Sequence, residues 1–262
     1  MAGVAGQPIV HSLSPLIHTA WIAAAGLDAD YRAFGPEDAA AFADLVAAGR
    51  QGELRGLNVT APFKEQALAL ADQAGPAART SGSANLLLFE AGRVRAESTD
   101  GAGLMTALAE QALGLDVRGQ AVVVLGAGGA ARAAVAVLID AGAEVGVVNR
   151  TRARAEALAA ALGATVADAD GLDRAVLVVN ALSVAPDIDL SRLRDDVVLM
   201  DMTYRPLTTA FLAAGRQRGM TTVDGLAMLI GQARPSFRAL FGRDAPDVDV
   251  RTAALAALGE TS

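Results

Sequence analysis

The strand-like segment Ala121–Leu125 and the glycine turn after it constrain the fold of this chain most strongly. Its five apolar residues run directly into the turn Gly126-Ala127-Gly128-Gly129, and a helical pattern follows over residues 130–141. A buried strand that turns sharply into a helix is the building unit of a parallel α/β sheet. The sequence therefore predicts an α/β fold with a doubly wound sheet in this part of the chain.

The same turn predicts a dinucleotide site. Gly126 permits the tight turn, Gly128 lets the backbone approach a pyrophosphate at the helix N-terminus, and Ala131 takes the third-glycine position. A purely structural turn is the alternative interpretation. The flanking strand, the helix and the end of the next strand all fall where a nucleotide site requires them, which favours the nucleotide.

The residues after that next strand indicate which nucleotide is bound. The predicted strand Glu144–Val148 is followed by Asn149-Arg150-Thr151-Arg152-Ala153-Arg154, where an NAD site usually carries Asp or Glu. Guanidinium groups can hold a 2′-phosphate through paired hydrogen bonds, whereas cations at a helix start oppose the helix dipole. Solvated arginines on a helix surface are the alternative, and the pattern predicts NADP as the cofactor.

Short Val/Leu runs alternate with alanine-rich helical patterns along the rest of the chain. This alternation is typical of α/β layers, and the helix predicted over residues 102–113 could bridge two domains. Further helices are predicted over residues 152–162 and 228–241. The predicted strands are Val4, Tyr31–Phe34, Gly56–Val59, Asn85–Phe89, Ala121–Leu125, Glu144–Val148, Val176–Val179, Val197–Met200 and Thr221–Val223.

Composition excludes several classes of function. The chain has 262 residues, 53% of them hydrophobic, which is enough for two ordinary cores or one large one. The absence of cysteine excludes disulfides and thiolate metal sites and favours a reducing compartment. With two histidines, a histidine-built metal centre is not expected, and a formal net charge of −7 argues against a nucleic-acid partner.

The start of the chain and its apolar runs carry no targeting pattern. The first eight residues lack a basic segment before an apolar core, and no uncharged apolar run approaches the ~20 residues that a spanning helix needs. We therefore expect a cytoplasmic protein without a membrane partner, present as a monomer or a homodimer.

A lone lysine marks a second candidate site. In the segment 56–64, GLNVTAPFK, Pro62 should take the chain out of a strand and toward a helix that begins near Lys64. Every other Lys-or-Arg position in the chain is arginine. Proton transfer needs the ammonium of lysine, because its pKa can be tuned by the protein and that of arginine cannot. A solvated lysine at a helix start is the alternative.

Two further polar segments belong with Lys64. Ser12 and Ser14 flank a leucine in the segment 6–18, and Asp100 ends the first α/β half, at the mouth of the expected interdomain cleft. Taken alone, the serines predict helix caps, and Asp100 predicts the N-cap of a helix that starts near Ala102.

Together these segments resemble the shikimate dehydrogenase family, NADPH-dependent reductases of 3-dehydroshikimate. The resemblance runs nearly from end to end and rests on eight segments in the same order. They are HSLSP at 11–15, NVTAPFK at 58–64, Asn85, STDG at 98–101, LGAGGAARA at 125–133, NRT at 149–151, DMTYRP at 201–206 and DGLAMLIGQ at 224–232.

The resemblance implies two α/β domains, with residues 1–101 and 226–262 binding substrate and residues 102–225 forming an NADP-binding Rossmann domain. It implies a catalytic pair of Lys64 and Asp100, in which the lysine ammonium donates a proton to the alkoxide formed by hydride transfer. The substrate residues would be Ser12, Ser14 and Tyr204 at the carboxylate, and Thr60, Asn85, Asp100 and Gln232 at the ring hydroxyls. The cofactor residues would be Gly126, Ala127, Gly128, Gly129 and Ala130 at the pyrophosphate, Asn149, Arg150, Thr151 and Arg154 at the adenosine ribose and its phosphate, and Met202 and Gly225 beside the nicotinamide.

Two alternative functions are compatible with this pattern. One is a quinate or aminoshikimate dehydrogenase on the same scaffold, against which the serine pair Ser12 and Ser14 argues. The other is a non-catalytic NADP-binding regulator, which would have no need of Lys64 and Asp100. The chain also departs from the family pattern at four residues. Leu86 and Leu182 make their surroundings in the substrate pocket and the cofactor-side loop more apolar, and they leave open a paralogue with relaxed, weakened or shifted substrate choice, whereas Ser98 keeps a small hydrogen-bonding side chain. The departing residues are Thr19, Leu86, Ser98 and Leu182.

Overall fold

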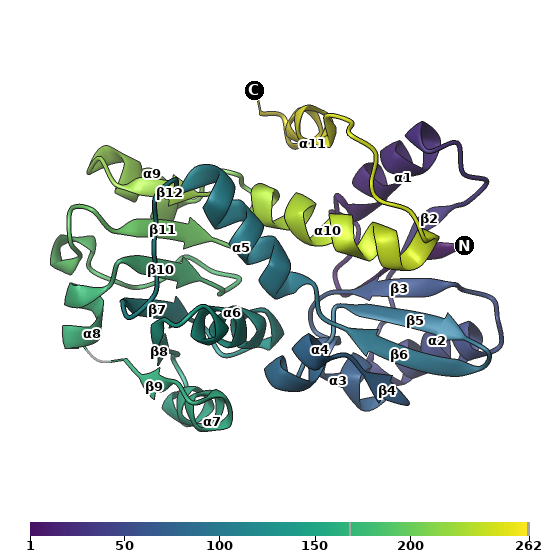
Figure 1. Ribbon diagram of the computed structural model, residues 1–262, viewed down its shortest axis with the longest axis horizontal. Helices are drawn as coiled ribbons and strands as arrows, with labels where there is room; N and C mark the ends of the chain where they lie inside the picture. The colour runs from purple at the N-terminus through teal and green to yellow at the C-terminus, as the bar shows by residue number, and fades with distance from the viewer. Residues whose placement is uncertain (168, 261–262) are drawn as a thin grey trace. The chain divides into compact units, whose positions relative to one another are not determined.

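The computed structural model describes residues 1–167 and 169–260 as two compact units (Figure 1). The first unit contains residues 1–99 and 232–262, and the second contains residues 100–231. The domain limits expected from the sequence, residues 1–101 with 226–262 and residues 102–225, stay a prediction. Helix α10 (Gly225–Phe241) begins in the second unit and continues into the first.

The first unit holds a mixed six-stranded sheet in the order β2-β1-β3-β5-β6-β4. Strand β1 runs parallel to β2 and β3, β5 runs antiparallel to β3 and β6, and β4 runs parallel to β6. The elements are β1 (Ala2–Ala5), α1 (Ser14–Ala24), β2 (Tyr31–Phe34), α2 (Ala39–Arg50), β3 (Gly56–Val59), α3 (Lys64–Ala69), β4 (Gln73–Ala74), α4 (Pro76–Ser81), β5 (Leu86–Glu90), β6 (Arg93–Glu97) and α11 (Val250–Leu258).

The second unit holds a parallel sheet in the order β12-β11-β10-β7-β8-β9. In Figure 1 these strands follow one another from top to bottom on the left of the view. The chain starts in the middle of this sheet and moves outward in each direction, which is the doubly wound dinucleotide-binding order. The elements are α5 (Asp100–Gln111), β7 (Ala121–Leu125), α6 (Gly129–Asp140), β8 (Glu144–Val148), α7 (Arg152–Leu162), β9 (Thr165–Val166), α8 (Ala169–Arg174), β10 (Leu177–Asn180), a 3₁₀ turn η1 (Leu190–Arg192), β11 (Val198–Asp201), α9 (Ala210–Gln217) and β12 (Thr221–Val223).

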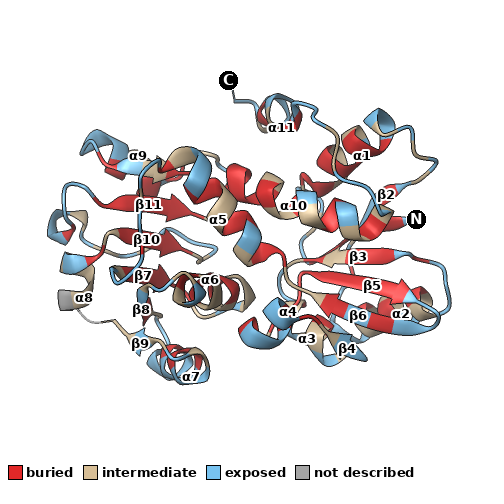
Figure 2. Cartoon of the chain, viewed as in Figure 1, coloured by how far each residue is buried: buried red, intermediate tan, exposed pale blue. Residues whose placement is uncertain are grey.

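The second sheet is covered on both faces, because alternate residues of its strands belong to different cores. Val122 and Val124 of β7 pack with α5, α6 and α7, while Val123 and Leu125 pack with α9. Figure 2 accordingly shows β7, β10 and β11 as buried. A strand buried on both faces reads as a continuous apolar run, which is why this sheet was predictable from sequence.

The structure confirms the predicted α/β fold, with a doubly wound sheet and C-terminal residues that return to the first unit. Strands β2, β3, β7, β8 and β12 have their predicted bounds. The expectation that Asp100 caps a helix starting near Ala102 is wrong, since Asp100 is itself the first residue of α5. Strand β6 was not predicted, although Val94 and Ala96 alternate with charged residues in the way that a half-buried strand requires.

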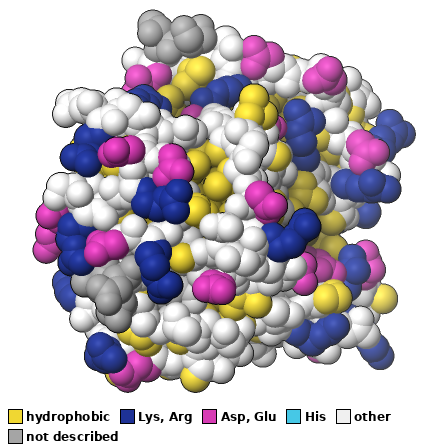
Figure 3. Space-filling view, turned by 60° about the vertical axis from the view of Figure 1, so that its left-hand side comes forward, with side chains coloured by type: hydrophobic (Ala, Val, Ile, Leu, Met, Phe, Trp, Pro, Cys, Tyr) yellow, Lys and Arg dark blue, Asp and Glu magenta, His cyan; other side chains and the backbone are white. Residues whose placement is uncertain are grey.

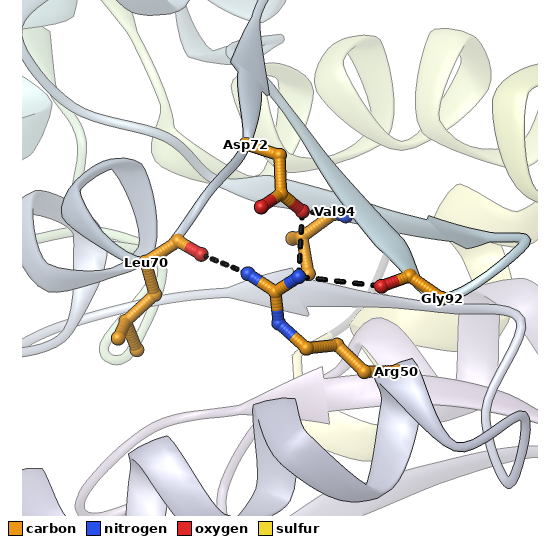
Figure 4. A network of polar contacts seen from close by, with 5 residues as sticks. All are labelled: Arg50, Leu70, Asp72, Gly92 and Val94. Atoms are coloured by element: carbon orange, nitrogen blue, oxygen red, sulfur yellow. Dashed lines mark hydrogen bonds and ion pairs between the residues drawn. The ribbon is translucent and has the colours of Figure 1, made fainter.

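An ion pair holds the end of α2 against the rim of the first sheet (Figure 4). Nη1 of Arg50 lies 2.6 Å from a carboxylate oxygen of Asp72, and Nη2 donates to the carbonyl of Leu70. The same Asp72 oxygen accepts the backbone N–H of Val94 at 2.7 Å. These hydrogen bonds, that of Arg50 first, lower the pKa of Asp72 below its usual value. The network therefore fixes the loop between α3 and β4 without contributing to the candidate site.

The face of the molecule drawn in Figure 3 carries charges of both signs. Its basic and acidic side chains lie interspersed, which does not suggest a single-sign patch on this face. Within the described part of the chain, no helix combines the length and apolarity needed to cross a membrane.

A buried histidine lies in the aromatic core of the first unit. The ring of His18 stacks on Tyr31 with centroids 4.1 Å apart and packs edge to face with Trp21. Only 1% of His18 is exposed, and its Nδ1 is buried without a hydrogen-bond partner among the described residues. Burial lowers the pKa of His18 from 6.5 to about 3, so the folded protein holds this ring in its neutral form.

Acid should therefore destabilise the protein through His18. Below pH 6.5 the unfolded chain takes up a proton that the folded protein does not accept until about pH 3. In this window we expect the free energy of unfolding to fall by up to about 1.4 kcal/mol per pH unit. Urea unfolding of His18→Phe, which keeps an aromatic ring on Tyr31, should show a shallower pH dependence. His11→Phe, at an exposed position, is the matched control, and equal slopes in all three proteins would contradict this account.

Candidate active site

The carboxyl ends of the second sheet gather most of the predicted cofactor residues. The backbone N–H of Gly126, just after β7, donates to the carbonyl of Val148 at 2.7 Å, and that of Ala181 donates to Leu125 at 2.9 Å. Met202, just after β11, donates in the same way to Asn180. The loops that follow β7, β8, β10 and β11 therefore meet at one edge of the sheet, where ligands of doubly wound folds bind.

The glycine turn has the backbone that was predicted. Gly126 has φ of 119°, a conformation that other residues rarely adopt, and a Cβ there would lie 3.3 Å from the carbonyl of Ala181. Gly128 is the N-cap of α6 and brings no side chain to the helix end. A Cβ built on Gly128 would meet no atom within 4 Å. The turn is therefore tight at Gly126 and open at Gly128, as a pyrophosphate site requires.

This difference between the two glycines gives a testable prediction. Gly128→Ala should fold with a loss of about 1 kcal/mol or less, because its backbone angles are ordinary and the space around it is open. Its methyl group would project into the space assigned to the pyrophosphate, so the Kd for NADPH should rise at least about tenfold. Nucleotide fluorescence titration measures this. An unchanged Kd in a folded Gly128→Ala variant would exclude a pyrophosphate from this turn.

Three arginines follow β8 at the same edge, and the structure separates them by their partners. Arg152 forms an ion pair of 2.8 Å with Glu156, one turn further along α7. Arg150 and Arg154 are exposed, and neither side chain has a hydrogen bond or ion pair with any described residue. Asn149 donates through Nδ2 to the carbonyl of Thr151, the N-cap of α7. The guanidinium groups of Arg150 and Arg154 thus remain available for an anionic ligand, and their role at a 2′-phosphate stays a prediction.

Met202 and Gly225, the two residues predicted beside the nicotinamide, lie against each other. A Cβ on Gly225 would come within 2.5 Å of the carbonyl oxygen of Met202. Any residue larger than glycine at 225 must therefore displace the backbone of Met202. Asp224, just before it, caps α10 through the N–H of Ala227 and accepts a hydrogen bond from Gln111 of α5.

A buried carboxylate at the same edge was missed by sequence reasoning. Asp201, which ends β11 and is 1% exposed, accepts hydrogen bonds from Nδ2 of Asn180 at 3.0 Å and from the hydroxyl of Thr209 at 2.8 Å. Its second oxygen accepts the N–H of Thr203. The sequence pattern that could have revealed it is a polar residue at the end of each of two apolar runs. These residues are Asn180 at the end of β10 and Asp201 at the end of β11. This network holds the backbone on each side of Met202.

In the first unit, Thr60 and Lys64 lie at the carboxyl end of β3. The backbone N–H of Thr60 donates to Ala5 at the end of β1, and that of Phe63 donates to Thr60. Lys64 is the first residue of α3, as predicted from Pro62, and its side chain is half-buried. The carbonyl of Lys64 accepts the N–H of Ala84, which brings the loop before β5 to the same edge.

Asn85 and Gln232, 147 positions apart, are brought into direct contact. Nδ2 of Asn85 lies 2.9 Å from Oε1 of Gln232. Asn85 directly precedes β5 and is 3% exposed, and Gln232 lies in α10. In the first unit, the structure therefore brings together the end of β3, the residue before β5 and the part of α10 from Gln232 onward, which carry Thr60, Lys64, Asn85 and Gln232.

The remaining predicted residues lie at the starts of helices or in loops. Ser14 is the first residue of α1, and the N-cap of this helix is Leu13 rather than a serine. The expectation of two capping serines is therefore only partly right. Ser12 does bind the helix start, because its Oγ accepts the N–H of Ser14 at 3.3 Å. Tyr204 is half-buried in the loop after β11, and Asp100 is 1% exposed. Ser12, Ser14 and Lys64 belong to the first unit, whereas Asp100 and Tyr204 belong to the second, so the pairing of Lys64 with Asp100 stays a prediction.

Two of the departures from the family pattern have packing roles. Leu86, the first residue of β5, is 1% exposed and pairs with Asn58 across the antiparallel strands. A terminal methyl of Leu182 lies 3.3 Å from where a Cβ of Gly126 would be, so Leu182 covers the glycine turn. Leu86 is thus a buried core residue of the first unit, and Leu182 packs against the cluster that contains Val123 and Leu125.

Comparison with known proteins agrees with this geometry. Residues 4–87 match the family described as "Shikimate dehydrogenase substrate binding domain", and residues 107–185 match "Shikimate / quinate 5-dehydrogenase". The chain is 51% identical over 276 residues to a shikimate dehydrogenase (NADP(+)) of Caulobacter vibrioides, covering 99% of this chain and 96% of the relative. It is 43% identical to the enzyme of that name from Maricaulis maris, over 99% of this chain and 96% of the relative.

A solved structure matches the whole fold. The shikimate 5-dehydrogenase of Thermus thermophilus, in complex with NADP(H) and shikimate, superposes with a TM-score of 0.90 at 35% identity and covers 98% of both chains. This chain therefore matches these enzymes over nearly its full length. It also carries the glycine turn, the arginines after β8 and Lys64 at the carboxyl end of β3. The protein belongs to the shikimate dehydrogenase family of NADP-dependent oxidoreductases.

Proposed function

We propose that this protein catalyses the reversible NADPH-dependent reduction of 3-dehydroshikimate to shikimate. The observation that carries the proposal is the lone Lys64 that follows β3 at the start of α3, within a chain that is 51% identical to a shikimate dehydrogenase. A non-catalytic NADP-binding regulator would not need an ionisable group at this edge.

The residues present fit NADP. Gly126 to Ala130 would hold the pyrophosphate, because Gly126 has the positive φ of the turn and Gly128 has open space above it. Arg150 and Arg154 would hold the 2′-phosphate, with Asn149 and Thr151 at the ribose. Met202 and Gly225 would lie beside the nicotinamide. When bound, this cofactor supplies the hydride.

Lys64 would act at the substrate oxygen. As an ammonium it stabilises the negative charge that develops on the C3 oxygen and donates a proton to it. In the oxidative direction the neutral amine accepts that proton. Asp100 would act as its partner, holding the lysine oriented and binding a ring hydroxyl.

Neutral groups would hold the rest of the substrate. The hydroxyls of Ser12 and Ser14 at the start of α1, with Tyr204, would bind the carboxylate without adding a second fixed cation beside Lys64. Thr60, Asn85 and Gln232 would bind ring hydroxyls, and the contact between the amides of Asn85 and Gln232 supports this. We assign this enzyme to the biosynthetic route to chorismate and aromatic amino acids, in the cytoplasm, as a monomer or homodimer.

The direct test is identification of the product. Purified protein incubated with shikimate and NADP⁺ should form NADPH and 3-dehydroshikimate in equal amounts, with the acid identified by chromatography and mass spectrometry. Because one matched family model is named for both acids, quinate is run in parallel. Turnover of quinate without turnover of shikimate would overturn the substrate assignment, and nucleotide binding without turnover of either acid would favour the regulator.

A further inference from the structure

A chain of buried and partly buried hydrogen bonds in the first unit connects its aromatic core to the two amides of the candidate substrate site. It contains two asparagines, and at each of them a backbone group decides which way the side-chain amide faces. Its members are Tyr31, Asn58, Asn85, Thr99, Gln232 and Ser236.

The orientation of the Asn85 amide is fixed by the backbone of Thr99. The N–H of Thr99 lies 2.8 Å from Oδ1 of Asn85, and a backbone N–H can only donate. Oδ1 must therefore face Thr99, which leaves Nδ2 to donate. Nδ2 donates to Oγ1 of Thr99 at 2.9 Å and to Oε1 of Gln232 at 2.9 Å.

The orientation of Gln232 follows from that of Asn85. Because Nδ2 of Asn85 can only donate, the atom of Gln232 that faces it must be the oxygen. The other end of the Gln232 amide, Nε2, then carries two hydrogens and no acceptor capacity. Gln232 is half-buried, so this end is the part of the side chain that a ligand can meet.

Asn58 and Ser236 hold the other side of the network. Nδ2 of Asn58 lies 3.3 Å from the backbone carbonyl of Asn85, which can only accept, so Oδ1 of Asn58 faces Tyr31 and accepts its hydroxyl at 2.8 Å. Nδ2 of Asn58 also donates to Oγ of Ser236 at 2.9 Å. The Ser236 hydroxyl lies 3.2 Å from that of Thr99 and is fully buried.

We infer that Thr99, Asn85 and Ser236 are positioning residues that set the hydrogen-bond polarity of Gln232, so that Gln232 meets the substrate only as a donor. The inference rests on the proposed function and deepens it. The substrate oxygen at Gln232 then accepts a hydrogen bond and must donate its own proton elsewhere. A ligand with a group that can only donate at this position, such as an ammonium, should be rejected.

Gln232→Glu and Gln232→Met test the polarity. Both remove the donor, and Glu keeps the oxygen that accepts from Asn85. At about pH 8 we expect each to raise KM for shikimate about tenfold or more. Toward about pH 5 the Glu variant should regain affinity relative to the Met variant, because a protonated carboxyl donates again. Wild-type KM values at each pH supply the reference.

Ser236→Ala tests the positioning role. It should raise KM for shikimate several-fold and leave KM for NADP⁺ unchanged, and its effect should shrink in the Gln232→Met background, where no donor is left to orient. Ser81→Ala is the matched control, because Ser81 is equally buried and donates to the carbonyl of Ser83. A purely structural role of Ser236 would lower stability as Ser81→Ala does and leave KM unchanged.

The outcomes separate this inference from the proposed function. Wild-type protein that turns over no shikimate overturns both. An active wild type with a Gln232→Glu variant of normal KM at about pH 8 overturns the donor assignment alone. If the effect of Ser236→Ala is the same in the Gln232→Met background as in the wild type, Ser236 does not act through Gln232.

Discussion

Replacement of Lys64 by alanine is expected to lower kcat by about 10²- to 10⁴-fold while KM for shikimate stays within about threefold. The ammonium acts on the oxygen that gains charge during hydride transfer, so its contribution is made in the transition state more than in the ground state. Steady-state kinetics with shikimate and NADP⁺ measure the change. Lys64 is half-buried at the start of α3, and alanine is a good helix former there, so the variant should fold.

Lys64→Arg is the matched control for charge. Arginine keeps the positive charge but does not release its proton, so kcat should stay close to that of the alanine variant. Recovery of most of the activity in Lys64→Arg would show that charge alone is needed. A large rise in KM with kcat intact in Lys64→Ala would make Lys64 a binding residue.

The double substitution Arg150→Ala/Arg154→Ala is expected to raise KM for NADP⁺ by about 10²- to 10⁴-fold and to leave KM for NAD⁺ nearly unchanged. The reason is that a 2′-phosphate would lose two charge-assisted partners, each contributing about 1.5–3 kcal/mol, whereas NAD⁺ has no phosphate there. Both side chains are exposed, so the fold should not be affected. The measurement is kcat/KM for each nucleotide at saturating shikimate.

Arg152→Ala provides the matched control on the same helix turn. Arg152 pairs with Glu156, so its removal should change KM for NADP⁺ by less than about threefold. If Arg152→Ala raised KM for NADP⁺ as much as the double variant does, the summed positive charge of this helix start would explain the preference for NADP⁺ over NAD⁺. If the double variant kept its NADP⁺ preference, another group would have to bind the phosphate.

The fold was predictable from sequence where the local structure follows from the properties of one kind of residue, as in an apolar run, a glycine turn or a proline. Val122 to Leu125 lie in a strand buried on both faces, and Gly126 has a φ of 119° that only glycine adopts readily. Pro62 correctly predicted the end of β3 and the start of α3 at Lys64. Strand β6 was missed because its charged residues at alternate positions mask the apolar pattern.

The polar networks were not predictable, because they depend on contacts between segments distant in sequence. Asn58 and Ser236 are 178 positions apart, and their hydrogen bond requires both the strand register of β3 and the packing of α10. Asp201 and Asn180 are cross-strand partners in adjacent parallel strands, which the sequence alone does not align. The helix-capping expectation for Asp100 failed because a carboxylate in the first turn interacts as favourably with the helix dipole as one at the N-cap.

The measurement that tests the central claim most directly is the rate of NADPH formation by the purified protein with shikimate or quinate and with NADP⁺ or NAD⁺. The account predicts that kcat/KM is highest for shikimate with NADP⁺ and falls when either the acid or the nucleotide is exchanged. Preference for quinate would contradict the substrate assignment, and equal rates with both nucleotides would contradict the role given to Arg150 and Arg154. No turnover with any of the four pairs, by folded protein that binds NADPH, would contradict the account as a whole.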